Sequence, residues 1–472
     1  MRSCDPNRPA KTAKRKENTM GKNKIPETGI YDARQLGTGR MLLLGFQHMV
    51  AMFGATILVP ILTGLDVSNT LLFAGLGTLL FHLITGGKVP AFLGSSFAFL
   101  GGYATIAPML GEQQNQPNLE MLPYACFGVA VSGLMYVILA AIIKSVGVKK
   151  VMRFFPPIVT GPIIIAIGLI LSSSAINNCE ANWLVAVVAI VVVIACNMWG
   201  KGMIKIIPIL IGVLTSYVVS MIVDPASRAV VAQKVSEAAW IGLPVHKEAT
   251  VFGLLSGNFD SGMLVTACVT IVPLAIATMM EHVGDICAIS STVGKNYIVE
   301  PGLNRTLMGD GLATTLASLF GAPANTTYGE NTGVLALSKV YDPRVIRLAA
   351  LFAIILSFCP KFAALVTAMP TATIGGVSMI LYGMISAVGV RNVVENRVDF
   401  TNTRNVIIAA LILVLALGIS NSTAGAVHIG SVSLSGLAVA SLVGILVNAI
   451  LPGKDYEFGV DIQGDTSVNF KV

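Results

Sequence analysis

The sequence predicts an all-α integral membrane protein with fourteen transmembrane segments, arranged as two inverted repeats of seven. Three observations predict this fold class: the composition, the spacing of the apolar segments and the distribution of positive charge. Of the 472 residues, 54% are hydrophobic and 12% are charged, and the mean hydropathy is +0.78. Soluble domains carry about 25% charged residues, so we expect most of this chain to lie in a lipid bilayer.

The apolar segments follow a polar, basic stretch over residues 1–37, which we interpret as a disordered cytoplasmic tail. Met20 within it could serve as an alternative translation start. Most segments have about the 20 residues that a helix needs to cross the bilayer, but polar residues interrupt the third and the tenth. A second cytoplasmic tail, residues 452–472, closes the chain. We place the segments at residues 40–62, 69–86, 89–109, 124–143, 154–173, 182–199, 203–223, 263–288, 304–320, 324–338, 345–367, 370–389, 404–420 and 431–451.

Positive charge falls mainly on one side of these segments, which sets their orientation. Only four of the 31 Lys and Arg residues lie on the side of the long connection 224–262, and the other 27 lie in the tails and in the opposite loops. Because cytoplasmic loops are enriched in Lys and Arg, we expect a multi-pass protein of the cell membrane with both termini in the cytoplasm. This distribution accounts for the net charge of +7 and argues against nucleic-acid binding.

The two halves of the chain resemble each other at three places, in the same order. The matching stretches are residues 47–48 with 281–282, 89–97 with 322–330, and 155–162 with 369–376, at offsets of 234, 233 and 214 residues. Since each half has seven segments, the second half begins on the other side of the membrane, and the repeat is inverted. Inverted repeats with paired broken segments are typical of secondary transporters whose site lies near the middle of the membrane.

The stretch Pro323–Gly333 is the centre of the predicted site. It is polar, contains Glu330 and lies between apolar segments, and Gly94–Ser96 interrupts the third segment in a similar way. Non-helical backbone at membrane depth survives only where it lines a cavity or is buried in protein, and an ionisable residue there indicates a functional site. We expect each broken segment to present the N–H groups of a half-helix N-terminus to a ligand.

Other ionisable residues also lie in apolar surroundings. Glu281 and Asp285 are four residues apart and share a helix face. Burial and like charge both disfavour the ionised form, so such a pair can bind a proton reversibly; alternatively, both face water at the helix end. Asp310 is either a ligand contact or a structural hydrogen-bonding group, and we interpret His48 as a structural partner. These four residues are the candidate proton-coupling groups.

The side chains in and near the broken segments suit a small ligand. Glu281 and Glu330 supply acceptors for ring N–H groups, and Phe97 and Tyr328 offer aromatic faces, unless these rings only pack in the core. With backbone donors, they suit a small, flat, uncharged heterocycle with alternating N–H and C=O groups. The seven cysteines are scattered, and the sequence has no metal-spaced cluster, phosphate loop or nucleophile motif. We therefore expect no cofactor and no enzyme activity.

Four motifs resemble those of the nucleobase–ascorbate transporter family, also called nucleobase:cation symporter-2. They are Gln47–Thr56, Pro90–Phe99, Glu281–Gly284 and Asn325–Asn331. The resemblance covers residues 38–451 and points to the branch of bacterial uracil permeases, since purine-type members usually have Gln-Asn where this chain has Glu330-Asn331.

The resemblance implies two domains that move against each other. A core domain would comprise residues 38–143 and 263–367, and a gate domain residues 144–223 and 368–451, with the extracytoplasmic connection 224–262 between them. Each broken segment would contribute a short strand to the core domain. Family members can dimerise through the gate domain, so the resemblance allows a homodimer.

The resemblance also assigns the substrate-binding residues, which are Phe97, Glu281, Tyr328, Gly329, Glu330 and Tyr382. The two glutamates would hydrogen-bond the pyrimidine ring, and backbone N–H groups at Phe97 and Gly329 would donate to its carbonyl oxygens. The aromatic rings at positions 97 and 328 would wall the site, and Tyr382 of the gate would close over it.

The implied activity is proton-coupled import of uracil across the cell membrane by alternating access. One departure leaves the coupling group open, because members of this branch can have a histidine where this chain has Asp285. Asp285 and Asp310 suggest a purine-type member, so a proton symporter for xanthine or urate is the first alternative. A passive nucleobase facilitator is the second.

Overall fold

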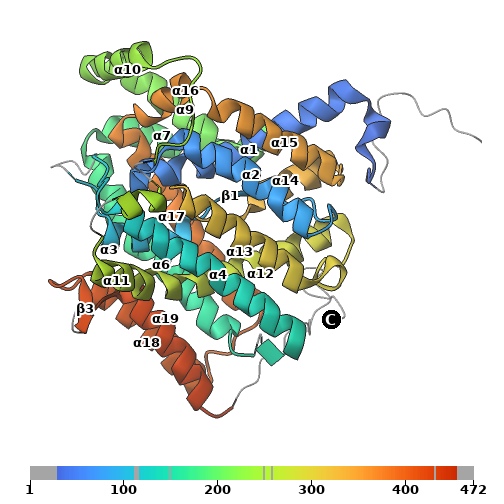
Figure 1. The fold of residues 1–472 in the computed structure, drawn as a ribbon, viewed down its shortest axis with the longest axis vertical. Coiled ribbons are helices and arrows are strands. Elements are labelled where there is room, and N and C mark those ends of the chain that lie inside the picture. Colours follow the sequence, from blue (N-terminus) through green and yellow to red (C-terminus); the bar gives the residue numbers. More distant parts are fainter. Residues whose placement is uncertain are drawn as a thin grey trace, which may run out of the picture.

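Helices make up most of the structure, a computed structural model that describes residues 29–110, 116–147, 150–151, 153–247, 250–256, 259–429 and 432–453. Figure 1 shows them packed side by side, as expected for the predicted all-α membrane class. Residues 1–28 and 454–472, which contain most of the two predicted tails, lie outside the described residues.

The first half of the chain forms nine of the labelled α-helices and one strand. They are α1 (Thr38–Thr63), α2 (Val67–Ile84), β1 (Leu93–Ser95), α3 (Leu100–Ile106), α4 (Leu122–Val146), α6 (Pro157–Glu180), α7 (Trp183–Trp199), α8 (Met203–Ile206), α9 (Pro208–Val223) and α10 (Pro225–Glu237). Side chains fix several helix starts: Asp66 accepts from the N–H of Asn69 at the start of α2, and Asn182 does the same for Val185 in α7.

The second half forms nine further α-helices and three strands. They are α11 (Ser261–Ile271), α12 (Ala275–Val293), α13 (Leu303–Leu319), β2 (Asn325–Thr327), α14 (Gly329–Ser338), α15 (Pro343–Ser357), α16 (Pro360–Thr367), α17 (Thr371–Glu395), α18 (Thr403–Ser420), β3 (Ala426–Ile429), β4 (Val432–Ser435) and α19 (Gly436–Ile450). Short 3-10 and π turns join some of them, including η5 (Val272–Leu274) between α11 and α12.

Each of the fourteen predicted segments overlaps at least one helix. Among the described residues, seven helices are long and apolar enough to cross a membrane alone, and nine spans result if each of two bent pairs counts as one. One pair, α15 and α16, is bent by 86°, so the predicted segment 345–367 is not one straight crossing. The other pair, α9 and α10, is bent by 113°. The cause is proline in both pairs: Pro360 and Pro225 open the second helix and cannot continue the hydrogen bonding of the first.

The helices pack in two groups, and exchanging the halves of the chain maps each group onto itself. In the first group, α13 lies against α4 as α2 lies against α15; in the second, α6 lies against α18 as α17 lies against α7. Glycines allow the closest contacts, because a Cβ on Gly311 would lie 2.5 Å from the backbone oxygen of Gly133, and one on Gly389 would lie 2.7 Å from that of Gly161. The packing therefore follows the repeat that the sequence predicts.

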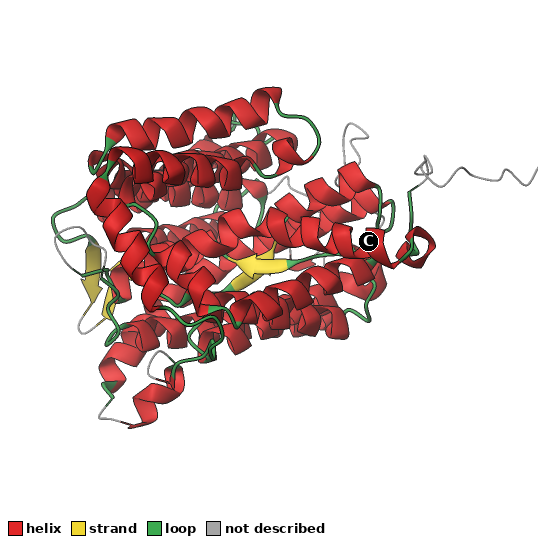
Figure 2. Cartoon of the chain, turned by 90° about the horizontal axis from the view of Figure 1, so that it is seen from above, coloured by secondary structure: helices red, strands yellow, loops and turns green. Residues whose placement is uncertain are grey.

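The two interrupted segments meet as a two-stranded sheet in the middle of the molecule (Figure 2). β1 pairs with β2 in antiparallel register, with Gly94 opposite Thr326. The predicted short strands in these segments are thus present. The strands begin 232 residues apart, and so do the helical turns after them, at Phe97 and Gly329. The structural offset is one residue smaller than the offset of the proline motifs.

Residues 29–36, which we call the N-terminal strap, are ordered although the sequence places them in the predicted disordered tail. Ile30 exchanges two backbone hydrogen bonds of 2.8 Å with the segment 339–341. The hydroxyl of Tyr31 donates to the backbone oxygen of Val293 at the end of α12, at 2.6 Å. Short-range backbone pairing with a distant loop leaves no hydrophobic periodicity in the sequence, so the strap could not be predicted from it.

Candidate functional site

Two helices begin where the paired strands end. Phe97 opens the helical turn that leads into α3, and Gly329 is the first residue of α14. The first N–H groups of a helix have no partner within that helix, and the helix dipole gives them partial positive charge. The sheet of β1 and β2 therefore holds two helix N-termini in one region of the protein, as the sequence predicts.

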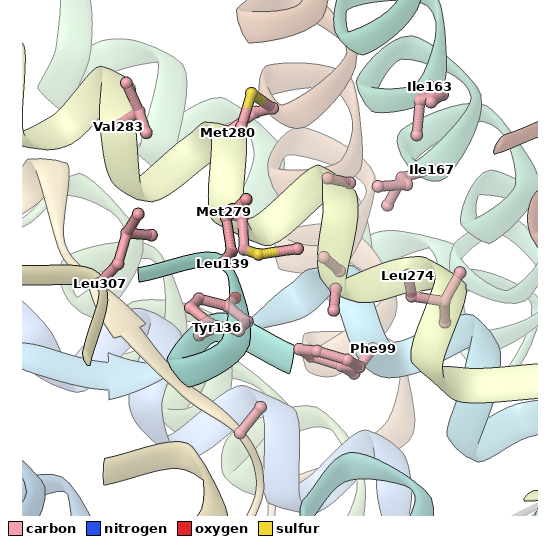
Figure 3. Packing of buried hydrophobic residues seen from close by; sticks show 14 of the residues in the cluster. Phe99, Tyr136, Leu139, Ile163, Ile167, Leu274, Met279, Met280, Val283 and Leu307 are labelled. Atoms are coloured by element: carbon pink, nitrogen blue, oxygen red, sulfur yellow. The ribbon is translucent and has the colours of Figure 1, made fainter. Parts of the chain in front are cut away.

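One face of α12 is accessible and carries two carboxylates. Glu281, Gly284 and Ala288 are exposed and Asp285 is half-buried, whereas His282 between them is fully buried. The spacing of three, four and seven residues is that of one helix face. The opposite face packs into the core, where Figure 3 shows Met279, Met280 and Val283 among side chains of α4, α6 and α13.

Glu330 lies close to this face of α12. It is half-buried in the first turn of α14, where the helix N-terminus favours a negative charge. Glu281 is close enough to interact electrostatically with it. Gly329 is exposed, and the nearest atom to a Cβ built on it is Oδ1 of Asp285 at 4.0 Å. The structure thus brings Glu281, Asp285, Gly329 and Glu330 together, although they come from two separate helices.

Asp310 lies deeper, in a buried row of polar groups. Its Oδ2 atom is 3.1 Å from Nδ1 of His282, and both side chains have 0% exposure. The hydroxyl of Thr327, at the end of β2, lies 3.5 Å from the same His282 nitrogen and donates to Oδ2 of Asp285 at 2.8 Å. These contacts connect α13, α12 and β2, so Asp310 belongs to the site through His282 and Thr327.

His48 supports α14 from α1. The side-chain nitrogen of Asn331 lies 3.1 Å from Nδ1 of His48 and donates to the backbone oxygen of His48 at 3.0 Å. Both residues are buried, and Asn331 directly follows Glu330. This arrangement is that of a structural partner that holds the start of α14 in place.

The three aromatic residues predicted for the site lie in different surroundings. The hydroxyl of Tyr328 donates to the backbone oxygen of Ser95 at 2.8 Å, and its ring fills the space in which a Cβ on Gly94 would lie 2.5 Å away. Tyr328 therefore locks β2 onto β1. Phe97 is partly exposed and Tyr382 is buried, and both border the apolar cluster that contains Tyr328.

The sequence reasoning missed the roles of His282, Thr327 and Asn331. His282 marks a repeat but sits on the buried side of α12, and its contact with Asp310 joins two helices, which no spacing reveals. Thr327 could have been found by strand alternation, since it lies on the same face of β2 as Asn325, whose side chain is also hydrogen-bonded. Within the described ranges, no group of three or more His, Cys, Asp or Glu side chains could hold a metal ion.

The apolar helices and the paired broken segments define a multi-pass membrane transporter fold. The transmembrane domain of the cyanobacterial bicarbonate transporter BicA matches it with a TM-score of 0.56 and 14% identity, covering 89% of this chain and 99% of that one. Murine Slc26a9, an anion transporter, matches with a TM-score of 0.59 and 13% identity, covering 87% of this chain and 67% of that one. At these identities, the likeness concerns the fold alone.

Sequence comparison gives the family. Residues 39–425 match the profile described as Permease family (Xan_ur_permease). The uracil permease of Bacillus caldolyticus is 40% identical over 428 residues, covering 88% of this chain and 93% of the relative. The putative pyrimidine permease RutG of Escherichia coli (strain K12) is 37% identical over 441 residues, covering 92% and 94%. The chain belongs to this permease family, the nucleobase:cation symporter-2 family, which confirms the resemblance seen in its motifs. It is a transporter of the membrane and not an enzyme.

Proposed function

We propose that this chain imports uracil across the cell membrane by proton symport, through alternating access. The observation that carries the proposal is the pair Glu281 and Glu330, two accessible carboxylates within electrostatic reach of each other and beside a helix N-terminus. Uracil has two ring N–H groups and two carbonyl oxygens. The carboxylates would accept from the N–H groups, and the backbone N–H groups at Phe97 and Gly329 would donate to the carbonyl oxygens.

The names of the relatives support the choice of substrate. Both the Bacillus caldolyticus relative and an Escherichia coli (strain K12) relative that is 35% identical over 418 residues are named uracil permease. A buried site that pairs with every donor and acceptor of a ligand rejects analogues that lack them, since the unmatched protein groups would stay unpaired. We therefore expect thymine and cytosine, which alter the ring or its hydrogen-bonding groups, to bind less well than uracil.

The two helix groups support the proposed mechanism. We assign residues 38–143 and 263–367 to a core domain and residues 144–223 and 368–451 to a gate domain. The site residues Glu281, Asp285 and Glu330 lie on core helices, while Tyr382 lies on gate helix α17. The fourteen helical segments would then form two inverted repeats with both termini in the cytoplasm, and movement of the core against the gate would expose the site to each side in turn.

The direct test is uptake by the purified full-length chain in liposomes. We expect an inward proton gradient to drive accumulation of labelled uracil, and a protonophore to abolish the accumulation. Accumulation that is unchanged when the gradient is collapsed would contradict proton coupling and support a passive facilitator or another driving ion.

A purine substrate is the alternative, favoured by the acids Asp285 and Asp310 in positions that suggest purine-type members. Competition in the same liposomes separates the two substrates. Unlabelled uracil should displace labelled uracil at lower concentration than xanthine or urate does, and the reverse order would replace the proposed substrate with a purine.

A further inference from the structure

Four polar side chains form an unbroken row from the accessible face of α12 into the core of the protein. In order they are Asp285, Thr327, His282 and Asp310, and successive contact atoms are 2.8, 3.5 and 3.1 Å apart. The row begins at a half-buried carboxylate and ends at a carboxylate with no exposure. Its only member on a strand is Thr327, which lies between the two acids and ends β2.

The chemistry of these groups suits proton transfer. A hydroxyl can accept one hydrogen bond while it donates another, which a carboxylate or a neutral imidazole nitrogen cannot do alone. A buried imidazole beside a buried carboxylate can hold an added proton, because the negative charge compensates the positive one. The Oδ1 atom of Asp310 and the Nε2 atom of His282 have no hydrogen-bond partner among the described residues. The pair therefore depends on the contacts at Nδ1 and Oδ2.

Other titratable groups face the row from neighbouring elements. They are Glu281 and Cys287 on α12, Glu330 on α14 and Tyr136 on α4. The hydroxyl of Tyr136 already donates to Thr278, and from α2 the edge of the Phe81 ring packs against His282. Thr327 thus provides the hydroxyl that lies within contact distance of both Asp285 and His282.

We propose that Thr327 relays the coupled proton between Asp285 and the buried His282–Asp310 pair, which makes it a positioning and relay residue for the proposed proton symport. The inference rests on the proposed function for its purpose, but the relay itself concerns this chain's own groups. The proton on Oδ2 of protonated Asp285 passes to Oγ1 of Thr327 while the hydroxyl proton of Thr327 passes to Nδ1 of His282. Asp285 is left ionised, Thr327 is unchanged, and His282 is left as imidazolium beside the Asp310 carboxylate. The reverse transfer returns the proton.

The relay also links the proton to the substrate. Thr327 is two residues before Gly329 and three before Glu330, so a change in its hydrogen bonds acts on the strand end that positions the start of α14. A proton held at the His282–Asp310 pair would thereby be sensed at the substrate site without direct contact.

The strand offers a matched set of variants for the test. Thr327→Val removes the hydroxyl and keeps the shape, and Thr327→Ser keeps the hydroxyl. Thr326→Val is the control, because Thr326 is its buried neighbour on β2 and its hydroxyl has no hydrogen-bond partner within the described part of the chain. We expect Thr327→Val to reduce gradient-driven uracil accumulation by about tenfold or more, with a much smaller effect on uracil counterflow. Thr327→Ser should restore accumulation, and Thr326→Val should behave as wild type. Wild-type accumulation by Thr327→Val, or its failure to be restored by Thr327→Ser, would overturn the proposal.

A second measurement separates the relay from the transport proposal. Infrared titration of the purified chain without substrate, between about pH 5 and pH 9, follows the carboxylic acid bands. We expect Thr327→Val, but not Thr326→Val, to alter the band that Asp285→Asn removes. If wild type does not concentrate uracil, the proposed function fails, and the infrared result still decides the relay: an altered band supports it, and an unaltered one refutes it.

Discussion

The segments β1–α3 and β2–α14 have the same architecture but different chemistry. Each is a three-residue strand followed by a helical turn, and the two strands pair with each other. The first supplies Gly94 and Phe97, neither of them charged. The second supplies Thr327 and Glu330, which contact or approach the acids of α12. The repeat therefore provides a symmetric frame, and only its second half carries the ionisable groups of the site.

The same difference holds at other matched positions. At an offset of 234 residues, Glu281 corresponds to Gln47 and Asp310 to Leu76. The two matched histidines also differ, since His282 lies beside an acid and His48 beside the neutral Asn331. One half of an internal repeat can thus keep the structural contacts while the other acquires the charges, and the following variants test that division.

We expect the largest effect from Glu330→Gln. The amide keeps the size of the side chain but replaces an acceptor by a donor, which would face a ring N–H group of uracil. The loss of a hydrogen bond to a charged group, with an unpaired donor left behind, should weaken uracil binding by about 100-fold. Calorimetry on the purified chain would measure it, with Glu300→Gln as the exposed control. Near-normal affinity in Glu330→Gln would remove this residue from the site.

The histidine pair tests the division of roles directly. We expect His282→Gln to reduce gradient-driven accumulation by about tenfold or more, because the imidazole that holds the proton is gone. His48→Gln should instead lower the melting temperature by a few degrees and leave coupling intact, because it loosens the contact between α1 and Asn331. Uptake and thermal unfolding of both variants would measure this, and equal loss of coupling in the two would contradict the comparison.

Glycine-to-alanine changes in the two segments should differ in stability. A methyl group at Gly94 would lie 2.5 Å from the Tyr328 ring, whereas one at Gly329 would have no atom closer than 4.0 Å. Overpacking at Gly94→Ala should cost about 1–3 kcal/mol, and Gly329→Ala should unfold like wild type while its methyl group obstructs the site. Thermal unfolding and uracil binding of the two variants would show opposite defects if this is right.

The smallest effect is expected where the halves meet on the surface. Lys88, before β1, donates to Glu300, after α12, at 2.6 Å, and both are exposed. The hydrogen bond and the positive charge of Lys88 lower the pKa of Glu300. This contribution to stability is therefore present above the pKa of glutamate in the unfolded chain and is lost as the pH falls through the lowered value. Lys88→Met should remove that dependence with a barely measurable change in melting temperature, since exposed pairs contribute little. A clear loss of stability at neutral pH would show that the pair matters more.

The sequence could predict the membrane class, the broken segments and the acids near them, because composition, charge and interrupted hydropathy are local properties. The pairing of β1 with β2 was implied by the family resemblance, and its register was not, since three-residue strands have too short a pattern. The buried row from Asp285 to Asp310 could not be predicted for a different reason: its contacts join residues that are 25 to 42 positions apart in the chain. The bends before Pro225 and Pro360 were readable from proline in principle, but apolar residues on both sides made α15 and α16 look like one segment.

The N-terminal strap has a consequence for handling the protein. Its pairing through Ile30 covers the backbone N–H and C=O groups of residues 339–341 that a neighbouring strand would otherwise use. Deletion through residue 36 would leave those groups open to pairing with another chain, a known route to aggregation. Affinity tags and shortened N-termini should therefore end before Gly29, and preparations that lose the strap to proteolysis should be recognisable by their tendency to form larger particles.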